Sequence, residues 1–259
     1  MRQEQLFWER MRHFTRARIG TGRAGTALTT AAMLEFQLAY ARARDAIYHP
    51  FDRAAMTRAI TPTAVCLTES AAGDRPTYLR RPDLGRRLND ESTKRLAACR
   101  GDWDLIFVVG DGLSARAVET YAAAVINSCL GFTRDLRVGP IVLATQARVA
   151  LGDHVASILG ANAVMMLIGE RPGLSVADSL GIYFTYKPYV GMPDSGRNCI
   201  SNIHAHGLDP AVAAHKATWL IREASRIGLS GIGLKENAGS MAPEIGHVPS
   251  LPSAIPSFL

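Results

Sequence analysis

Three short apolar runs, each followed by a turn, most constrain the fold of this chain of 259 residues. The runs cover residues 105–109, 141–144 and 163–168. Runs of this length are typical of strands that are buried on both faces. Because candidate helices follow the first two runs, the chain predicts an open α/β sheet with parallel strand pairs. Such sheets bind ligands beyond the carboxyl ends of their strands, so we expect a site in the turns that follow the three runs.

The region before these runs predicts one helix and an irregular segment. An apolar stripe indicates a helix over residues 26–48, and we expect this stripe to pack against a core. Its members are Met33, Phe36, Tyr40, Ala43 and Ile47. Residues 49–80 are expected to be irregular, because prolines break any long element there. These prolines are Pro50, Pro62 and Pro76.

The region after residue 150 predicts further elements of the same sheet. A short helix is expected to begin near Asp153 and to end at Gly160. Asp209 and Pro210 are typical of a helix start, and Gly228 of the end of that helix. Two more strands are expected at residues 180–186 and 198–203.

Composition excludes several classes of protein. No apolar run reaches the ~18 residues that a membrane helix needs. The first residues lack the apolar segment of a secretion signal, so we expect a cytoplasmic protein without a membrane partner. The four cysteines are scattered, with neither a C-x-x-C pair nor zinc-site spacing, which predicts reduced thiols.

The net charge of +6 keeps nucleic-acid binding open as an alternative. Basic residues are enriched in residues 2–23, which would suit a non-enzymatic nucleic-acid or scaffold protein. However, no zinc finger and no RNA-binding signature accompanies them, and an acidic partner protein would serve as well. We therefore predict no nucleic-acid partner.

A G-x-G-x-x-G pattern at residues 20–25 raises a second alternative, a stand-alone α/β nucleotide-binding oxidoreductase. In dinucleotide-binding folds this pattern lies between a buried strand and a helix. Here the preceding segment is basic, and Asp45, which has the spacing of a ribose-binding acid, lies inside the predicted helix. A tight turn explains the glycines better.

Four further polar residues are candidates for a catalytic or ligand-binding role. Ser114 is interpreted as a helix cap because the glycines of a nucleophile elbow are missing around it. Asp111 either contacts a ligand or shapes its turn. His204 and His206 would lie on one face of a strand, yet no third metal ligand has useful spacing. We therefore predict neither a catalytic residue nor a metal site in this chain.

Several segments resemble the light chain of ethanolamine ammonia-lyase, over about residues 12–236. The specific ones are GERPGL (169–174) and RNCISNI (197–203), which stand in the family's order and spacing. RIGTGRAG (18–25) and RPDLGRR (81–87) support them. The resemblance implies a Rossmann-like domain that covers one side of adenosylcobalamin (coenzyme B12). A heavy chain, a TIM barrel, would cover the other side and bind ethanolamine, and this carbon–nitrogen lyase would be active only as a hetero-oligomer of both chains. The complex would form acetaldehyde and ammonia by a radical mechanism that begins with homolysis of the cobalt–carbon bond.

The same resemblance implies three cobalamin contacts in this chain. They are Val149 in QARVAL, Glu170 in GERPGL and Cys199 in RNCIS. Glu170 can accept hydrogen bonds from the amide groups at the corrin edge, and its alternative role is an ion pair with an arginine such as Arg171. Val149 and Cys199 would otherwise be ordinary core residues. No D-x-H-x-x-G segment supplies a histidine for cobalt, which agrees with base-on binding.

The resemblance also suggests a division of the chain. We expect a helical region that contacts the heavy chain over residues 1–80 and the cobalamin-binding domain over residues 81–236. A Pro/Ser-rich tail over residues 237–259 has no assigned role. Several relatives carry a long N-terminal extension that targets a bacterial microcompartment. Only about fifteen residues precede the RARIG segment here, so targeting by that route is doubtful.

Overall fold

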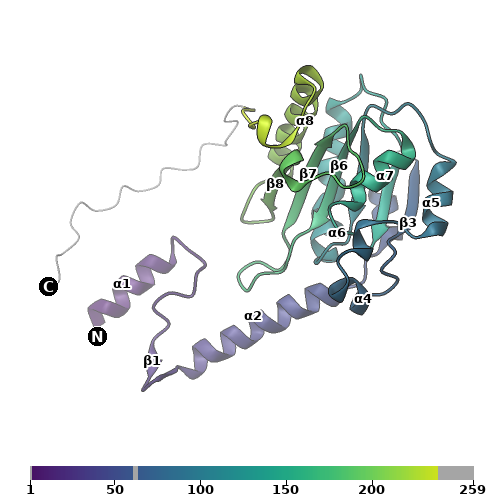
Figure 1. Cartoon of the computed structure of the whole chain (residues 1–259). Helices are drawn as coiled ribbons and strands as arrows, with labels where there is room; N and C mark the ends of the chain where they lie inside the picture. Colours follow the sequence, from purple (N-terminus) through teal and green to yellow (C-terminus); the bar gives the residue numbers. More distant parts are fainter. Residues whose placement is uncertain (1, 61–63, 239–259) are drawn as a thin grey trace.

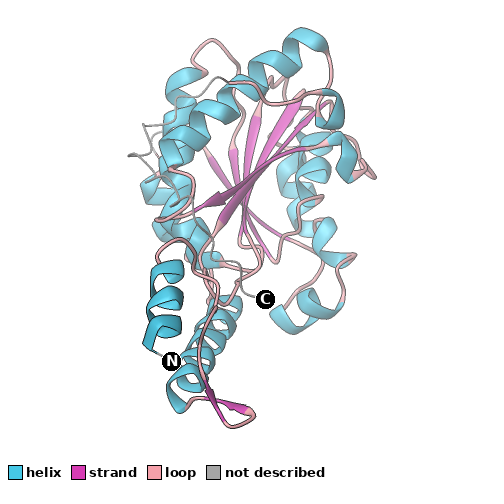
Figure 2. Cartoon of the chain, turned by 90° about the vertical axis from the view of Figure 1, so that its left-hand side faces the viewer, coloured by secondary structure: helices cyan, strands magenta, loops and turns pink. Residues whose placement is uncertain are grey.

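The computed structural model describes residues 2–60 and 64–238, and its largest part is a mixed sheet of six strands in the order β3-β5-β4-β6-β7-β8 (Figures 1 and 2). Strands β3, β5, β4 and β6 are parallel to one another, and β7 is antiparallel to both β6 and β8. The strands are β3 (Val65–Glu69), β4 (Ile106–Gly110), β5 (Ile141–Thr145), β6 (Ala163–Gly169), β7 (Leu180–Tyr186) and β8 (Asn198–Ile203). The α/β class and the five strands expected from the sequence are thus confirmed.

The connections between the parallel strands run over opposite faces of the sheet. Helix α6 (Ala115–Phe132) joins β4 to β5 on one face, and α7 (Leu151–Leu159) joins β5 to β6 on the other. Because β5 and β6 lie on either side of β4, the turns after β4 and β5 diverge at adjacent strand ends. A crevice forms where neighbouring connections diverge in this way.

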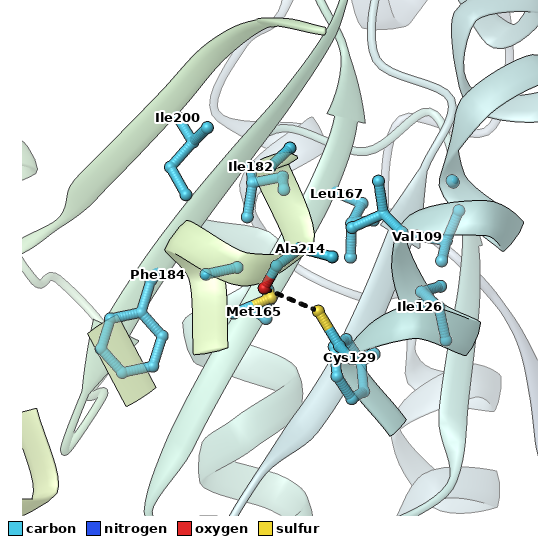
Figure 3. Packing of buried hydrophobic residues seen from close by; sticks show 14 of the residues in the cluster. Val109, Ile126, Cys129, Met165, Leu167, Ile182, Phe184, Ile200 and Ala214 are labelled. Carbon is cyan, nitrogen blue, oxygen red and sulfur yellow. Dashed lines mark hydrogen bonds between the residues drawn. The ribbon is translucent and has the colours of Figure 1, made fainter. Parts of the chain in front are cut away.

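The face below α6 holds the larger core, which α8 (Pro210–Ile227) completes. Figure 3 shows Val109, Met165 and Leu167 of the sheet pointing toward these helices. Where the two helices meet, the Cys129 thiol lies 3.7 Å from the carbonyl oxygen of Ala214. Burying each Val, Leu or Met side chain of this core stabilises the fold by about 1.5–3 kcal/mol.

On the opposite face of the sheet, helices cover β3, β5, β4 and β6 and leave β7 and β8 uncovered. Helix α7 packs there on Val164 and Met166 of β6, and α5 (Asp90–Ala97) packs on α7 and β3. Farther along, Tyr183 of β7 is half-buried and Cys199 of β8 is exposed. The strand pair β7–β8 therefore presents part of this face to the surroundings.

Residues 49–80 are more regular than the sequence predicted. They contain α3 (Arg53–Ala59), β3 and α4 (Arg75–Arg80), while Pro62 lies outside the described residues. Asp52 and Asp74 begin the two helices by accepting hydrogen bonds from Ala55 N and Thr77 N. Because prolines mark the ends of short elements as readily as they break long ones, the prediction of an irregular segment was wrong.

The N-terminal residues form an arm that projects from the sheet (Figure 1). Its longest element, α2, begins after Thr29, whose hydroxyl accepts a hydrogen bond from Ala32 N. The expectation that the apolar stripe packs on a core is wrong for most of the helix: Met33, Phe36 and Tyr40 are exposed, and Ala43 is buried. The arm consists of α1 (Arg2–Arg12), β1 (Arg23–Ala24), β2 (Ala27–Leu28) and α2 (Thr30–Tyr48).

Helix ends in the second half of the chain follow the sequence signals. Gly160 and Gly228 end α7 and α8 in the left-handed conformation, and Asp209 caps α8. Residues 239–259, nearly all of the predicted tail, lie outside the described residues. In the described ranges, no helix combines the length and apolar character that crossing a membrane requires. The remaining single turns are η1 (Leu84–Arg86), η2 (Asp194–Gly196) and η3 (Gly231–Gly233).

Candidate functional site

The three turns that the sequence marked meet around one pocket of about 390 Å³ at the carboxyl ends of β4, β5 and β6. Two of the three predicted contacts, Val149 and Glu170, line this pocket. Tyr183 of β7 supplies part of its wall, and Tyr78 of α4 supplies another part. The remaining lining residues are Gly112, Leu113, Arg148, Ile168, Gly169 and Arg171.

A buried carboxylate holds the turn that carries Val149. Asp111, at the end of β4, accepts hydrogen bonds of 3.0 Å from Gln146 N and Ala147 N. Its own charge is balanced by Arg75, whose Nη1 lies 3.5 Å from the carboxylate. Burial nevertheless raises the pKa of Asp111, against the lowering effect of these hydrogen bonds and of Arg75. Asp111 therefore shapes the turn, as the sequence left open, and reaches across the crevice between β4 and β5.

The next residues place a fixed guanidinium beside Val149. Gln146 has a positive φ of 55°, which is strained for a residue other than glycine. Arg148 lies over the Tyr78 ring, with 4.2 Å between its guanidinium carbon and the ring centre, and donates to the Tyr78 carbonyl. Its Nε atom is buried and has no hydrogen-bond partner among the described residues. A buried donor without a partner is costly, so the contacts with Tyr78 hold this side chain in place against that cost.

Glu170 follows β6 directly and is half-buried. Its Oε2 atom accepts a hydrogen bond of 2.5 Å from the Ser179 hydroxyl, and its backbone N–H donates to the Ser179 carbonyl. Its Oε1 atom lies over Gly181, where a Cβ atom would come within 2.9 Å. In the described part of the chain Glu170 forms no ion pair with Arg171, so its role as a salt-bridge partner is not supported. The second carboxylate oxygen is free to accept a hydrogen bond from a ligand.

Cys199 lies next to the pocket rather than in its lining. It pairs with Tyr183 across β7 and β8, and their side chains lie on the open face of the sheet. Surrounding protein atoms, the Cys199 thiol and the Glu170 charge together raise the pKa of Tyr183 to about 12. Partial burial of the thiol raises the pKa of Cys199 as well, and the negative charge of Glu170 adds to this effect. Glu170, Tyr183 and Cys199 are therefore electrostatic neighbours.

Other sequence candidates lie elsewhere or have other roles. Gly20, Gly22 and Gly25 have positive φ values in the turns of the exposed arm, far from any βαβ unit. Ser114 stands at the start of α6, yet its hydroxyl does not cap the helix and instead donates to the Ala177 carbonyl. The cap prediction was right in position and wrong in its hydrogen bond.

The two histidines lie in the loop after β8, not on a strand as the sequence suggested. His206 N donates to the Nδ1 atom of His204. They contribute to a different pocket, between α2 and residues 173–178. The described residues contain no group of three or more His, Cys, Asp or Glu side chains that could hold a metal ion.

Sequence reasoning missed three residues of the site. Tyr78, Arg148 and Tyr183 all line the pocket. Arg148 was detectable in principle, because it directly precedes Val149 in a turn already marked. Tyr78 carried no signal, since its segment was expected to be irregular.

Comparisons with known proteins agree on one family. The model of the family "ethanolamine ammonia-lyase light chain (EutC)" matches residues 5–235. A relative from Xanthomonas campestris pv. campestris (strain B100) is 51% identical over 239 residues, which cover 89% of this chain and 88% of the relative. A relative from Azotobacter vinelandii (strain DJ) is 49% identical, with 89% and 88% covered.

A third relative, from Pseudomonas syringae pv. tomato (strain DC3000), is 48% identical over 243 residues and covers 89% of this chain and 83% of the relative. All three relatives are named ethanolamine ammonia-lyase small subunit. The hypothesis of a stand-alone oxidoreductase finds no support in these matches or in the placement of Gly20 to Gly25. The chain belongs to the ethanolamine ammonia-lyase light chain family, a family of lyase subunits.

Proposed function

We propose that this chain is the small subunit of an ethanolamine ammonia-lyase and that it holds one side of base-on adenosylcobalamin. The large subunit would cover the other side and bind ethanolamine, which the complex converts to acetaldehyde and ammonia. When bound, the cofactor supplies the radical chemistry, and the protein supplies binding, orientation and electrostatics. The observation that carries this proposal is the convergence of Val149, Glu170 and the Tyr183–Cys199 pair around one pocket.

The residues present fit a corrin. Its ring faces are apolar, and its edge carries amide side chains that both donate and accept hydrogen bonds. Val149 and the Tyr183 ring offer apolar surface, while the free Oε1 atom of Glu170 can accept from an amide N–H. The Arg148 guanidinium lines the same pocket and can donate a hydrogen bond to an acceptor. Cys199, small and exposed beside them, allows a close approach to the open face of β7 and β8.

Exposed apolar side chains on the arm support the proposal that it contacts the large subunit. Five large apolar side chains of α2 between residues 33 and 40 are exposed. Consecutive helical residues point about 100° apart, so these side chains occupy two adjacent sides of the helix, Met33, Phe36 and Tyr40 on one and Leu34 and Leu38 on the other. We propose that the arm within residues 1–80 contacts the large subunit, while residues 81–236, together with β3 and α4 of the first region, form the Rossmann-like cobalamin-binding domain. The described exposed side chains are Met33, Leu34, Phe36, Leu38 and Tyr40.

A Glu170→Ala variant tests the site. In the purified complex of both subunits, loss of a charged acceptor should weaken adenosylcobalamin binding by roughly tenfold to a hundredfold. Glu170→Gln keeps one acceptor oxygen and should lose less. Affinity is measured by absorbance titration, and Glu223→Gln, a half-buried carboxylate of α8 that pairs with Arg226 and does not line the pocket, serves as the control.

Two failures can be told apart. A folded, correctly paired complex that forms no acetaldehyde from ethanolamine in a cobalamin-dependent manner would reject the proposed function. Unchanged affinity in Glu170→Ala, with normal activity of the parent complex, would reject only the assigned contact.

A further inference from the structure

Two thiols lie side by side at the edge of the sheet, outside the candidate site. Cys66 belongs to the edge strand β3, and Cys99 follows α5, which packs on that strand (Figure 1). Their sulfur atoms are 3.7 Å apart, although 33 positions separate the two residues in the chain. Both residues are half-buried, so a small molecule can reach them. An approach of less than about 2 Å would bring the sulfur atoms to the length of a disulfide bond.

The other two cysteines have no such neighbour. Cys129 is fully buried where α6 meets α8. Cys199 is exposed on β8, on the far side of the sheet from β3. Among the described residues, which include all four cysteines, Cys66 and Cys99 are the one pair of sulfur atoms in contact. An oxidant can therefore leave an adduct on Cys199, whereas Cys66 and Cys99 can bond to each other.

The surroundings of the two thiols favour an order of reaction. Burial, and then the neighbouring Cys99 thiol, raise the pKa of Cys66 to about 11, against a lowering effect of Arg95. Because the thiolate is the attacking species in disulfide exchange, Cys66 is poorly suited to begin the reaction. Once Cys99 is bonded to another sulfur, its thiol no longer raises the pKa of Cys66, and Cys66 loses its proton more readily.

We propose that Cys66 and Cys99 form a reversible oxidation site, with a small-molecule disulfide such as oxidised glutathione as the oxidant. The Cys99 thiolate attacks one sulfur of the oxidant, breaks its S–S bond and releases one thiolate, which takes up the proton that Cys99 lost. The Cys66 sulfur then attacks Cys99 in the mixed disulfide, and the second thiolate leaves with the proton of Cys66. Two protein thiols are thus oxidised to one disulfide, while the oxidant is reduced to two thiols.

The new bond would close a loop that carries part of the wall of the candidate site. The loop spans residues 67–98 and includes α4 and η1. From these elements, Tyr78 and Gly85 pack against Arg148. A crosslink between the ends of this loop restricts the unfolded chain, so oxidation should stabilise the fold. Because α5 already packs on β3, the bond joins neighbouring elements and should change the native structure little.

Redox equilibration tests the site in the purified complex of both subunits. The complex is incubated with mixtures of reduced and oxidised glutathione at mildly alkaline pH, its free thiols are blocked, and its peptides are mapped by mass spectrometry. We expect the Cys66 and Cys99 peptides to be joined, with the loss of two hydrogens, and dithiothreitol should separate them. The joined fraction should follow the square of the glutathione concentration divided by that of its disulfide, whereas a mixed adduct follows the simple ratio.

Serine variants assign the reaction to the two residues. Cys66→Ser and Cys99→Ser should each abolish the joined peptides and leave a glutathione adduct on the remaining cysteine. Cys199→Ser is the matched control and should keep the crosslink. In the full chain, oxidation should raise the urea midpoint of the Cys199→Ser control and not that of the other two variants. Urea unfolding of the reduced proteins checks that every variant folds.

Three results would overturn the proposal. The first is a parent complex in which Cys199 acquires glutathione while Cys66 and Cys99 stay unbonded. The second is a crosslink that forms only in urea, which would belong to the unfolded chain. The third is a bond from either residue to Cys199 or to a cysteine of the large subunit. Acetaldehyde formation is measured separately, so a failure of the proposed function would be visible without affecting this test.

Discussion

Arg75 and Asp111 join the arm to the turns that form the candidate site. Arg75 Nε donates to the Ile47 carbonyl near the end of α2, and its Nη1 donates to the Gly112 carbonyl after β4. The same Nη1 atom reaches Gln146, whose backbone N–H is held by Asp111. A single side chain therefore restrains one helix and two turns. Such a hydrogen-bonded ion pair is worth more for its geometry than for its net energy, because desolvation offsets most of its attraction.

His154 gives a pH-dependent prediction at the scale of one residue. Its Nδ1 atom accepts a hydrogen bond of 3.0 Å from Leu88 N, which requires an unprotonated nitrogen. Burial, and then the positive charge of Arg87, lower its pKa below 6.5. The unfolded chain therefore binds the proton first as pH falls, so this contribution to stability is present above pH 6.5 and is lost as pH falls through the lowered pKa.

The measurement is urea unfolding of the parent chain and of His154→Asn at several pH values between 5 and 8. Asn can keep an acceptor oxygen near the Nδ1 position and does not titrate. The parent should lose stability relative to the variant on acidification, by less than the ~1.4 kcal/mol per pH unit that one proton allows, because water reaches the half-buried ring. A constant difference across this range would contradict the prediction.

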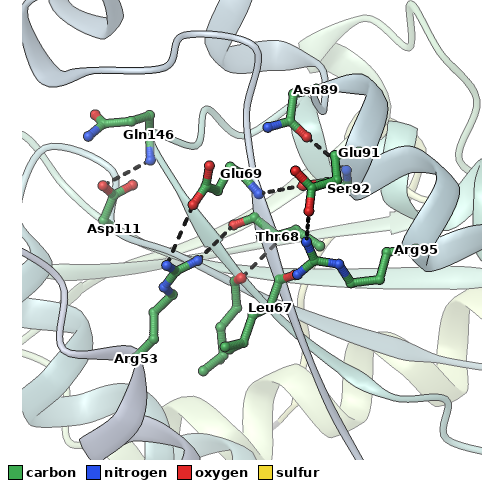
Figure 4. A network of polar contacts seen from close by, with 11 residues as sticks. Arg53, Leu67, Thr68, Glu69, Asn89, Glu91, Ser92, Arg95, Asp111 and Gln146 are labelled. Carbon is green, nitrogen blue, oxygen red and sulfur yellow. Dashed lines mark hydrogen bonds and ion pairs between the residues drawn. The ribbon is translucent and has the colours of Figure 1, made fainter.

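Strand β3 shows how an element at the edge of the sheet is protected. Polar side chains of α5 cover its backbone: Ser92 Oγ accepts from Glu69 N, and Arg95 donates to the Leu67 carbonyl (Figure 4). On the other side, Arg53 of α3 lies within 3.6 Å of the Glu69 carboxylate. Covered edges do not template pairing with other chains.

Removing one of these contacts should loosen the edge measurably. Ser92 is buried, so Ser92→Ala leaves Glu69 N without its acceptor and should lower the free energy of unfolding by about 1–3 kcal/mol. Ser157→Ala, at an exposed position of α7, is the control and should change stability little. The urea midpoint of each variant is compared with that of the parent chain. A Ser92→Ala midpoint equal to the parent's would show that water replaces the Ser92 hydroxyl.

The same element marks the limit of prediction from sequence. The strands β4 to β8 were predictable, since their apolar runs and the glycines or prolines around them are local signals. Strand β3 was not, because only pairing with β5 makes residues 65–69 a strand. For the site, the sequence indicated the three turns, and the family resemblance added Val149, Glu170 and Cys199. Tyr78 and Arg148 meet only through tertiary packing, which no local pattern reports.

At the scale of the whole molecule, apolar side chains are buried around the sheet and exposed on the arm. Two buried clusters stabilise the sheet from both faces, and most of the arm's large apolar side chains remain exposed. Exposed apolar side chains on two sides of a helix mark a surface that another protein can cover. The arm therefore contributes little to the stability of the isolated chain and, in our proposal, contributes mainly to assembly.

A double variant of α2 separates these two contributions. Leu34 and Leu38 are 59% and 52% exposed and lie one helical turn apart, so replacing both with Ser removes apolar surface from one side of the arm. The free energy of unfolding of the isolated chain should change by less than about 0.5 kcal/mol per substitution. Co-purification with the large subunit should fall severalfold, because each buried Å² of apolar surface stabilises an interface by about 25 cal/mol. Val190→Ser with Ile232→Ser removes apolar side chains outside the arm that are even more exposed, and should leave assembly intact. Normal recovery of the complex with the α2 variant would show that the large subunit does not bind the arm.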